Sequence, residues 1–81
     1  MSFDPHRMKI NIKGHASRRF EERFPDMSYE MMEHHFRTGK YIRIPKKEGE
    51  FGKVIKKIRK GKIIFKFTIR QEEITIITVE K

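Results

Sequence analysis

The sequence predicts an α+β domain in which two N-terminal helices pack on one face of a four-stranded antiparallel meander. Two observations carry this prediction. Apolar residues recur with helical spacing in the first half of the chain, and in the second half they alternate with polar residues, as in half-buried strands. The 81 residues suffice for one small domain, which we expect to span residues 1–81. Because there is no cysteine, its core must come from Phe, Ile and Met.

The first dozen residues predict a leader followed by a short extended segment. Residues 1–7 include an Asp-Pro pair and predict a loose leader. Residues 8–12 alternate apolar and polar side chains, which is typical of a short half-buried strand or an extended arm. This segment should end at Gly14.

A first helix is predicted from about His15 to Phe24, because Pro25 disfavours helical backbone in the residue before it. Its side chains divide into two stripes roughly 100° apart around the helix axis. The apolar stripe should pack on the sheet and comprises Ala16, Phe20 and Phe24. The polar stripe has a spacing of four residues and comprises His15, Arg19 and Arg23.

A second helix is predicted from the N-cap Ser28 to about Thr38. Gly39 should end it by adopting the left-handed conformation that glycine tolerates. The buried stripe of this helix has the spacing i, i+3, i+7 and comprises Tyr29, Met32 and Phe36.

Four strands are predicted after the second helix. The first stops at Pro45, which cannot donate a ladder hydrogen bond. The second covers residues 51–60, and its imperfect alternation predicts a bulge near residues 56–57. The third follows a turn at residues 60–61 and has the clearest alternation, over residues 62–70.

The last two strands should form a hairpin closed by Gln71 and Glu72. In this register Phe67 faces Ile76, and Thr78 lies on the helix-facing side, beside the polar stripe of the first helix. The predicted core face is Phe65, Phe67, Ile69, Ile74 and Ile76. The opposite face combines Lys66, Thr68, Arg70 and Thr75 with the apolar Ile64, Ile77 and Val79.

Positive charge is concentrated in the C-terminal half of the chain. The formal net charge is +9, and residues 40–81 carry thirteen basic and five acidic side chains. Such a cluster attracts polyanions, so we expect RNA to bind here, although a solvated face that keeps a small sheet soluble is the alternative. The predicted nucleic-acid-binding residues are Lys53, Lys56, Lys57, Arg59, Lys60, Lys62, Lys66 and Arg70.

No motif supports a metal site, a nucleotide cofactor or a serine or cysteine nucleophile. The four histidines do not form an H-E-x-x-H signature, so we expect no metal and no cofactor. No apolar run approaches the ~20 residues that cross a bilayer, and the first residues lack the apolar segment of a secretory signal. We therefore expect a cytoplasmic protein without membrane contact.

The polar stripe of the first helix carries the residue types that cleave RNA. Transesterification needs proton transfer, which suits histidine, and charge stabilisation on phosphate, which suits the planar fork of arginine. We therefore predict His15, Arg19 and Arg23 as catalytic residues. In the alternative interpretation the stripe is structural: His15 caps the helix, and the arginines pair with Glu22, Asp26 or a strand carbonyl.

A family resemblance involves the same residues. The motif H-A-x-x-R-x-x-x-R at residues 15–23, the helix after Ser28 and the final strand I-I-T-V at residues 76–79 resemble a small domain family of unknown function. That family is grouped with RelE-like and BrnT-like toxin folds, and the resemblance covers about residues 8–81. It implies a two-helix, four-strand α+β fold and, by extension, messenger RNA cleavage. It also adds Thr78, which matches a threonine of the terminal strand, to the catalytic set.

The chain departs from RelE-like toxins in one respect. Those toxins usually draw catalytic Arg, Lys or Tyr from the sheet and the C-terminal end, and here Tyr41 and Arg70 are only loose analogues. An acidic protein partner or an antitoxin is a further expectation that the resemblance leaves open.

Two functions are therefore expected. The first is an RNA-binding protein with metal-independent, toxin-like endoribonuclease activity. The alternative is a non-catalytic phage-type or accessory module that binds an acidic host protein or DNA through the basic sheet face. The sequence predicts no oligomeric state.

Overall fold

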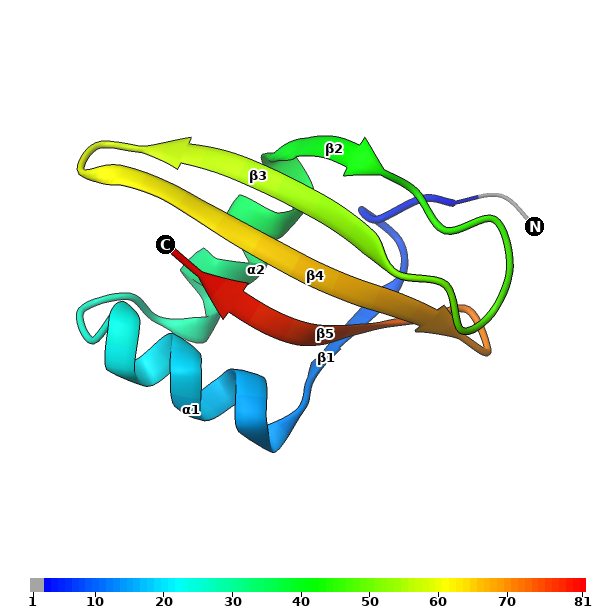
Figure 1. Ribbon diagram of the computed structural model, residues 1–81, viewed down its shortest axis with the longest axis horizontal. Coiled ribbons are helices and arrows are strands. Elements are labelled where there is room, and N and C mark those ends of the chain that lie inside the picture. The colour runs from blue at the N-terminus through cyan, green and yellow to red at the C-terminus, as the bar shows by residue number, and fades with distance from the viewer. Residues whose placement is uncertain (1–2) are drawn as a thin grey trace.

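The computed structural model describes residues 3–81 and shows an α+β fold with two helices and one five-stranded sheet (Figure 1). The spatial order of the strands is β1-β5-β4-β3-β2, and the antiparallel meander from β2 to β5 confirms the prediction. The predicted N-terminal strand adds a fifth member, which pairs in parallel with β5. The elements are β1 (Lys9–Ile12), α1 (Gly14–Arg23), α2 (Tyr29–Thr38), β2 (Lys40–Arg43), β3 (Gly52–Ile58), β4 (Gly61–Arg70) and β5 (Glu73–Glu80).

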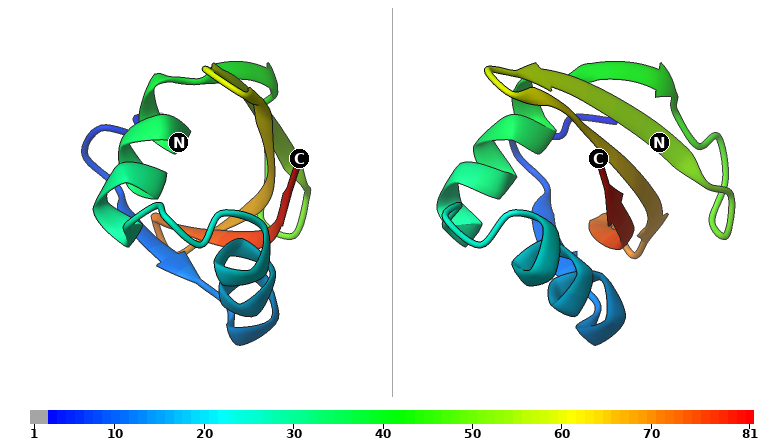
Figure 2. Two further views of the ribbon diagram at one scale, coloured as in Figure 1. Left: turned by 90° about the vertical axis from the view of Figure 1, so that its left-hand side faces the viewer. Right: turned by 60° about the vertical axis from the view of Figure 1, so that its left-hand side comes forward.

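The sheet is curved, and both helices lie on the same side of it (Figure 2). We call the side that faces the helices the inner face and the other side the outer face. The core between the helices and the inner face is entirely apolar among the described residues, with no buried polar or charged residue. It comprises Ala16, Phe20, Met32, Phe36, Val54, Ile63, Phe65, Phe67, Ile69, Ile74, Ile76 and Val79.

Helix α1 buries the apolar stripe that its spacing predicts. Ala16 and Phe20 are fully buried, which confirms their predicted packing on the sheet. Phe24 lies just beyond the helix, where it is half-buried and its ring centroid is 6.1 Å from that of Phe20. The helix therefore docks most firmly through its first two turns.

Helix α2 begins as predicted, because the Ser28 Oγ accepts a hydrogen bond from the Met31 backbone N at 3.1 Å. Met32 and Phe36 are buried. The prediction for Tyr29 is wrong, since this side chain is exposed. It occupies the first turn of the helix, where its hydroxyl donates to the Glu21 Oε1 at 2.8 Å and so ties the two helices together at the surface.

Gly39 ends α2 for a reason other than the predicted one. Its φ of −73° and ψ of 174° are extended, so the left-handed conformation expected there is wrong. A Cβ atom at this position would lie 2.5 Å from the Val54 Cγ1. Glycine is therefore required by the close approach of the chain to β3.

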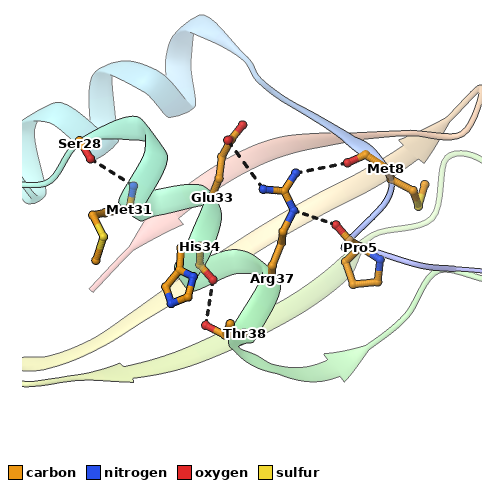
Figure 3. A network of polar contacts seen from close by, with 8 residues as sticks. All are labelled: Pro5, Met8, Ser28, Met31, Glu33, His34, Arg37 and Thr38. Atoms are coloured by element: carbon orange, nitrogen blue, oxygen red, sulfur yellow. Dashed lines mark hydrogen bonds and ion pairs between the residues drawn. The ribbon is translucent and has the colours of Figure 1, made fainter.

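The N-terminal segment is anchored rather than loose. Figure 3 shows Arg37 of α2 reaching it: the Arg37 Nε donates to the Pro5 carbonyl at 3.0 Å and the Nη2 to the Met8 carbonyl at 3.5 Å. The Glu33 Oε2 forms an ion pair with the Arg37 Nη1 at 3.8 Å. The Phe3 ring stacks on that of Phe67, with 5.8 Å between the centroids, and meets the Tyr41 ring edge-on at 5.4 Å. The prediction of a loose leader is thus wrong for residues 3–7, and residues 1–2 lie outside the described part of the chain.

The hairpin between β4 and β5 confirms the predicted turn. Gln71 and Glu72 have φ values of 50° and 63°, as a two-residue turn with left-handed central residues requires. The predicted pairs follow, with Ile69 opposite Ile74 and Phe67 opposite Ile76.

The irregular positions of the sheet differ from those predicted. The register between β3 and β4 is continuous, so the bulge predicted near residues 56–57 is wrong. Bulges lie instead between Tyr41 and Arg43 in β2 and where β5 passes Lys66 and Phe67 of β4. The turn between β3 and β4 consists of residues 59–60, one position earlier than predicted.

Candidate nucleic-acid interface

The end of the α1 polar stripe covers the edge of β5. Strand β1 stops opposite Ile76, where the Lys13 N donates to the Ile76 carbonyl at 3.3 Å. Beyond this point, within residues 3–81, β5 pairs only with β4, and its other edge has no strand beside it. The Arg23 Nη1 donates to the Val79 carbonyl at 3.1 Å. Arg23 thus satisfies a backbone acceptor on an unpaired strand edge, as the structural interpretation of the stripe expects.

The other two residues of the stripe are not engaged in this way. His15 is exposed in the first turn of α1, and Arg19 is half-buried one turn later. Within residues 3–81, neither side chain makes a hydrogen bond or an ion pair, and no side chain caps α1. The interpretation of His15 as a helix cap is therefore wrong, and both side chains can meet a ligand.

Thr78 does not lie beside the stripe. The β5 bulge inserts Ile77, so Thr78 pairs with Lys66 on the outer face rather than following Ile76 onto the inner face. Val79, which was predicted on the outer face, pairs with Phe65 and is fully buried in the core. One extra residue therefore reverses both predictions, and the four predicted catalytic residues do not converge.

Tyr41 and Arg70, the loose analogues of catalytic residues in RelE-like toxins, lie away from the α1 polar stripe. The Tyr41 hydroxyl donates to the Phe36 carbonyl at 2.8 Å, and burial raises the pKa of Tyr41 well above its ordinary value. Arg70 is the last residue of β4, far from the β3–β4 turn, and lies opposite Glu73 in the β4–β5 register. Tyr41 therefore supports the end of α2, and neither residue joins the α1 stripe.

The outer face carries a row of cations across three strands. Arg43 of β2 is directly opposite Lys53 of β3, which is directly opposite Lys66 of β4. Thr78 continues the row onto β5. Residues that oppose each other in a sheet point to the same side, with strands about 4.8 Å apart. We call Arg43, Lys53 and Lys66 the cationic row.

A second like-charged pair lies nearer the β3–β4 turn, where Lys57 is opposite Lys62. A favourable cross-strand pair contributes roughly 0.2–1 kcal/mol to a sheet, whereas like charges directly opposite each other destabilise it. In the strand register of residues 3–81, no acidic side chain is directly opposite either lysine of this pair or any member of the cationic row. Glu50 lies near the end of the row: the hydrogen bond from the Lys46 backbone lowers the pKa of Glu50, and the positive charges of Lys47, Arg43 and Lys46 lower it further. A bound polyanion would remove the repulsion between the opposed cations.

The predicted basic residues do not all share the outer face. Lys56 alternates with its neighbours onto the inner side, where it is half-buried near His35. Arg59 and Lys60 form the β3–β4 turn. Arg43, in contrast, was missed, because regular alternation would place it on the same face as Tyr41, and only the β2 bulge turns it to the face of Lys53.

The adjacent histidines of α2 form a small polar cluster on the inner side. The ring centroids of His34 and His35 are 5.9 Å apart, and within residues 3–81 the His35 Nδ1 is buried with no hydrogen-bond partner. Burial lowers the pKa of His35, and the positive charges of Lys56 and His34 lower it further. No group of three His, Asp or Glu side chains in the described chain is placed to hold a metal ion.

Comparisons with known proteins add no assignment. No family model, no curated protein and no solved structure matches the chain. No helix in the described range is long and apolar enough to cross a membrane. The geometry of the outer face therefore carries the functional argument.

Proposed function

We propose that this protein binds RNA through the outer face of its sheet, with the cationic row as the main phosphate contact. The observation that carries the proposal is the direct opposition of Arg43, Lys53 and Lys66 on three neighbouring strands. A fold gains no stability from this arrangement, whereas a chain of phosphates would neutralise it.

The placement of the helices favours RNA over conventional reading of DNA. Both helices pack on the inner face, and their exposed side chains include Glu21, Glu22 and Glu30. Neither helix is thus a free basic helix of the kind that enters the DNA major groove. A sheet surface that contacts phosphates suits the backbone and shape recognition common in RNA binding.

Cleavage is not part of the proposal. Arg23 is committed to the Val79 carbonyl, and Thr78 lies on the face opposite the helices. His15 and Arg19 then lack a second reactive partner among the predicted residues. RNA incubated with the protein in EDTA is expected to remain intact, and cleavage that disappears in His15→Ala would restore the nuclease hypothesis.

Binding can be tested by fluorescence anisotropy with a labelled, unstructured RNA of about 20 nucleotides at increasing KCl concentration. For single strands, the slope of log K against log salt is about −0.7 per neutralised phosphate. We expect a steep slope for the wild type and a slope shallower by about 0.7 for Lys66→Gln, which removes one contact.

Arg18→Gln is the matched control, because Arg18 is an exposed cation on α1 whose loss changes the net charge equally. This variant should leave the slope nearly unchanged. Affinity that does not depend on salt would contradict the proposal, as would equal effects of Arg18→Gln and Lys66→Gln.

A further inference from the structure

An open groove of about 670 Å³ lies between the β3–β4 turn and the loop that joins α1 to α2. It is lined by residues 23–27, Met31, Ile58, residues 60–62 and Lys81. We call it the hairpin groove. Its volume is in the range of about 300–1,000 Å³ that is typical of ligand sites.

The walls of the hairpin groove are apolar and adaptable. Phe24, Met27 and Ile58 are half-buried and pack against the core with one side, which leaves part of each side chain facing the groove. Met31 is 47% exposed on the first turn of α2 and is not needed to fill the core. Methionine adapts to irregular apolar surfaces, so these side chains can pack around inserted groups of different shapes.

The rim of the groove is positively charged. Lys60, Lys62 and Lys81 lie on the sheet side and Arg23 on the helix side, while Asp26 is the one acid among the described lining residues. An occupant with carboxylates around an apolar stripe would complement both the walls and the rim. This combination differs from the outer face, where cations oppose one another across the sheet.

We propose that the hairpin groove binds an acidic, amphipathic peptide segment of a partner protein. Apolar side chains of that segment enter between Met31 and Ile58, and its carboxylates meet Lys60, Lys62 and Lys81. Docking of an amphipathic helix in an apolar groove is a common mode of peptide recognition. The preponderance of aliphatic and thioether side chains favours peptide side chains over nucleobases, which prefer aromatic stacking surfaces.

The proposal does not depend on RNA binding, although Lys62 belongs to both surfaces: it faces Lys57 across the sheet and also lines the groove. Substitution of Met31 should therefore affect the peptide site without affecting the cationic row. The two functions can be separated by experiment.

The test is a phage-display selection of peptides of about 16 residues on the wild-type protein, with counter-selection on Met31→Glu. Met31→Glu places a carboxylate in the groove at an exposed position, so the fold should be retained. Ile42→Glu is the matched control, because Ile42 is 51% exposed on β2 and does not line the groove. Circular dichroism verifies folding of both variants.

Selected peptides are expected to be acidic, with apolar residues at helical spacing. They should bind the wild type and Ile42→Glu equally and Met31→Glu at least about tenfold more weakly. Lys60→Glu, a substitution in the exposed turn, should also weaken binding and does not depend on the folding of Met31→Glu. Bound peptide should shift the ¹³C methyl resonances of Met27 and Met31.

The proposal is overturned if no peptide is enriched, if the enriched peptides lack acidic residues, or if they bind Met31→Glu as tightly as the wild type. It is also overturned if the labelled RNA, and no peptide, shifts the Met31 methyl resonance. In that case the groove belongs to the nucleic-acid surface.

Discussion

The two faces of the sheet are built on opposite principles. On the inner face, pairs such as Val54 with Phe65 and Phe67 with Ile76 are fully buried and apolar. On the outer face, two lysine pairs, Lys53 with Lys66 and Lys57 with Lys62, lie on either side of the half-buried apolar pair of Ile55 and Ile64. Apolar burial drives folding, whereas opposed cations weaken it. The difference indicates that stability resides on the inner face, and it motivates the proposal that the outer face serves a ligand.

The largest expected effect is loss of an aromatic side chain from the inner face. Phe67 is fully buried, and its ring centroid lies 5.1 Å from that of Phe36. Phe67→Ala should lower the free energy of unfolding by about 3–5 kcal/mol, measured by urea denaturation. Thr68→Ala, on the adjacent outer-face position, should change it by less than about 0.5 kcal/mol. Similar losses for the two variants would remove the distinction between the faces.

A smaller loss should follow from adding one carbon to the inner face at Gly52. A Cβ there would collide with the Phe67 ring and lie 2.7 Å from the Pro45 Cδ. Gly52→Ala should therefore cost about 1–3 kcal/mol of stability, measured by thermal denaturation. Gly14→Ala is the control, because in the described chain its added Cβ would meet no atom within 4 Å apart from its own residue, its chain neighbours and the adjoining helix backbone. A Gly52→Ala protein as stable as the control would show that this part of the core is loosely packed.

Substitution at Arg23 separates its structural role from a catalytic one. Arg23→Met keeps the apolar stem but leaves the Val79 carbonyl without its donor, so stability should fall by about 1 kcal/mol in urea denaturation. Arg19→Met should have little effect, because within residues 3–81 the Arg19 side chain has no hydrogen-bond partner. Equal stabilities of the two variants would contradict the assignment of Arg23 to the strand edge.

His35 makes the stability of the fold weakly dependent on pH. Because burial lowers its pKa below the ordinary 6.5, with further contributions from Lys56 and His34, the folded state disfavours the protonated ring. Stability is fully present above pH 6.5 and declines as the pH falls below this value through the lowered pKa of the folded state. As the pH falls below 6.5, the urea concentration at the unfolding midpoint should therefore drop less in His35→Gln than in the wild type. His34→Gln should keep most of the drop, and an identical drop in all three proteins would exclude His35 as its source.

The sequence predicted most of the inner face because period-two alternation continues without interruption along β4. Ile63, Phe65, Phe67 and Ile69 are all buried, and the turn at Gln71 and Glu72 sets the register of the hairpin. Helix α1 was predictable because its apolar residues keep the helical period, so that Ala16 and Phe20 lie on one stripe.

The candidate site was less predictable, because the positions of its residues depend on tertiary contacts. The β5 bulge exchanges the faces of Thr78 and Val79, and a run of β-branched residues gives no sign of which residue is the extra one. The structural roles of Arg23 and Arg37 depend on carbonyls distant in the sequence, in β5 and in the N-terminal segment. Local patterns contain no information about such partners.

The most direct test of the account is a double-mutant cycle on Lys53 and Lys66, with unfolding free energy and RNA affinity measured on the same proteins at low salt. Lys53→Gln and Lys66→Gln should each raise stability by about 0.2–1 kcal/mol, with a smaller gain for the second substitution once the first is made. Both should weaken RNA binding. Loss of stability in either variant, together with unchanged RNA affinity, would contradict the claim that the cationic row is a binding surface maintained at the expense of the fold.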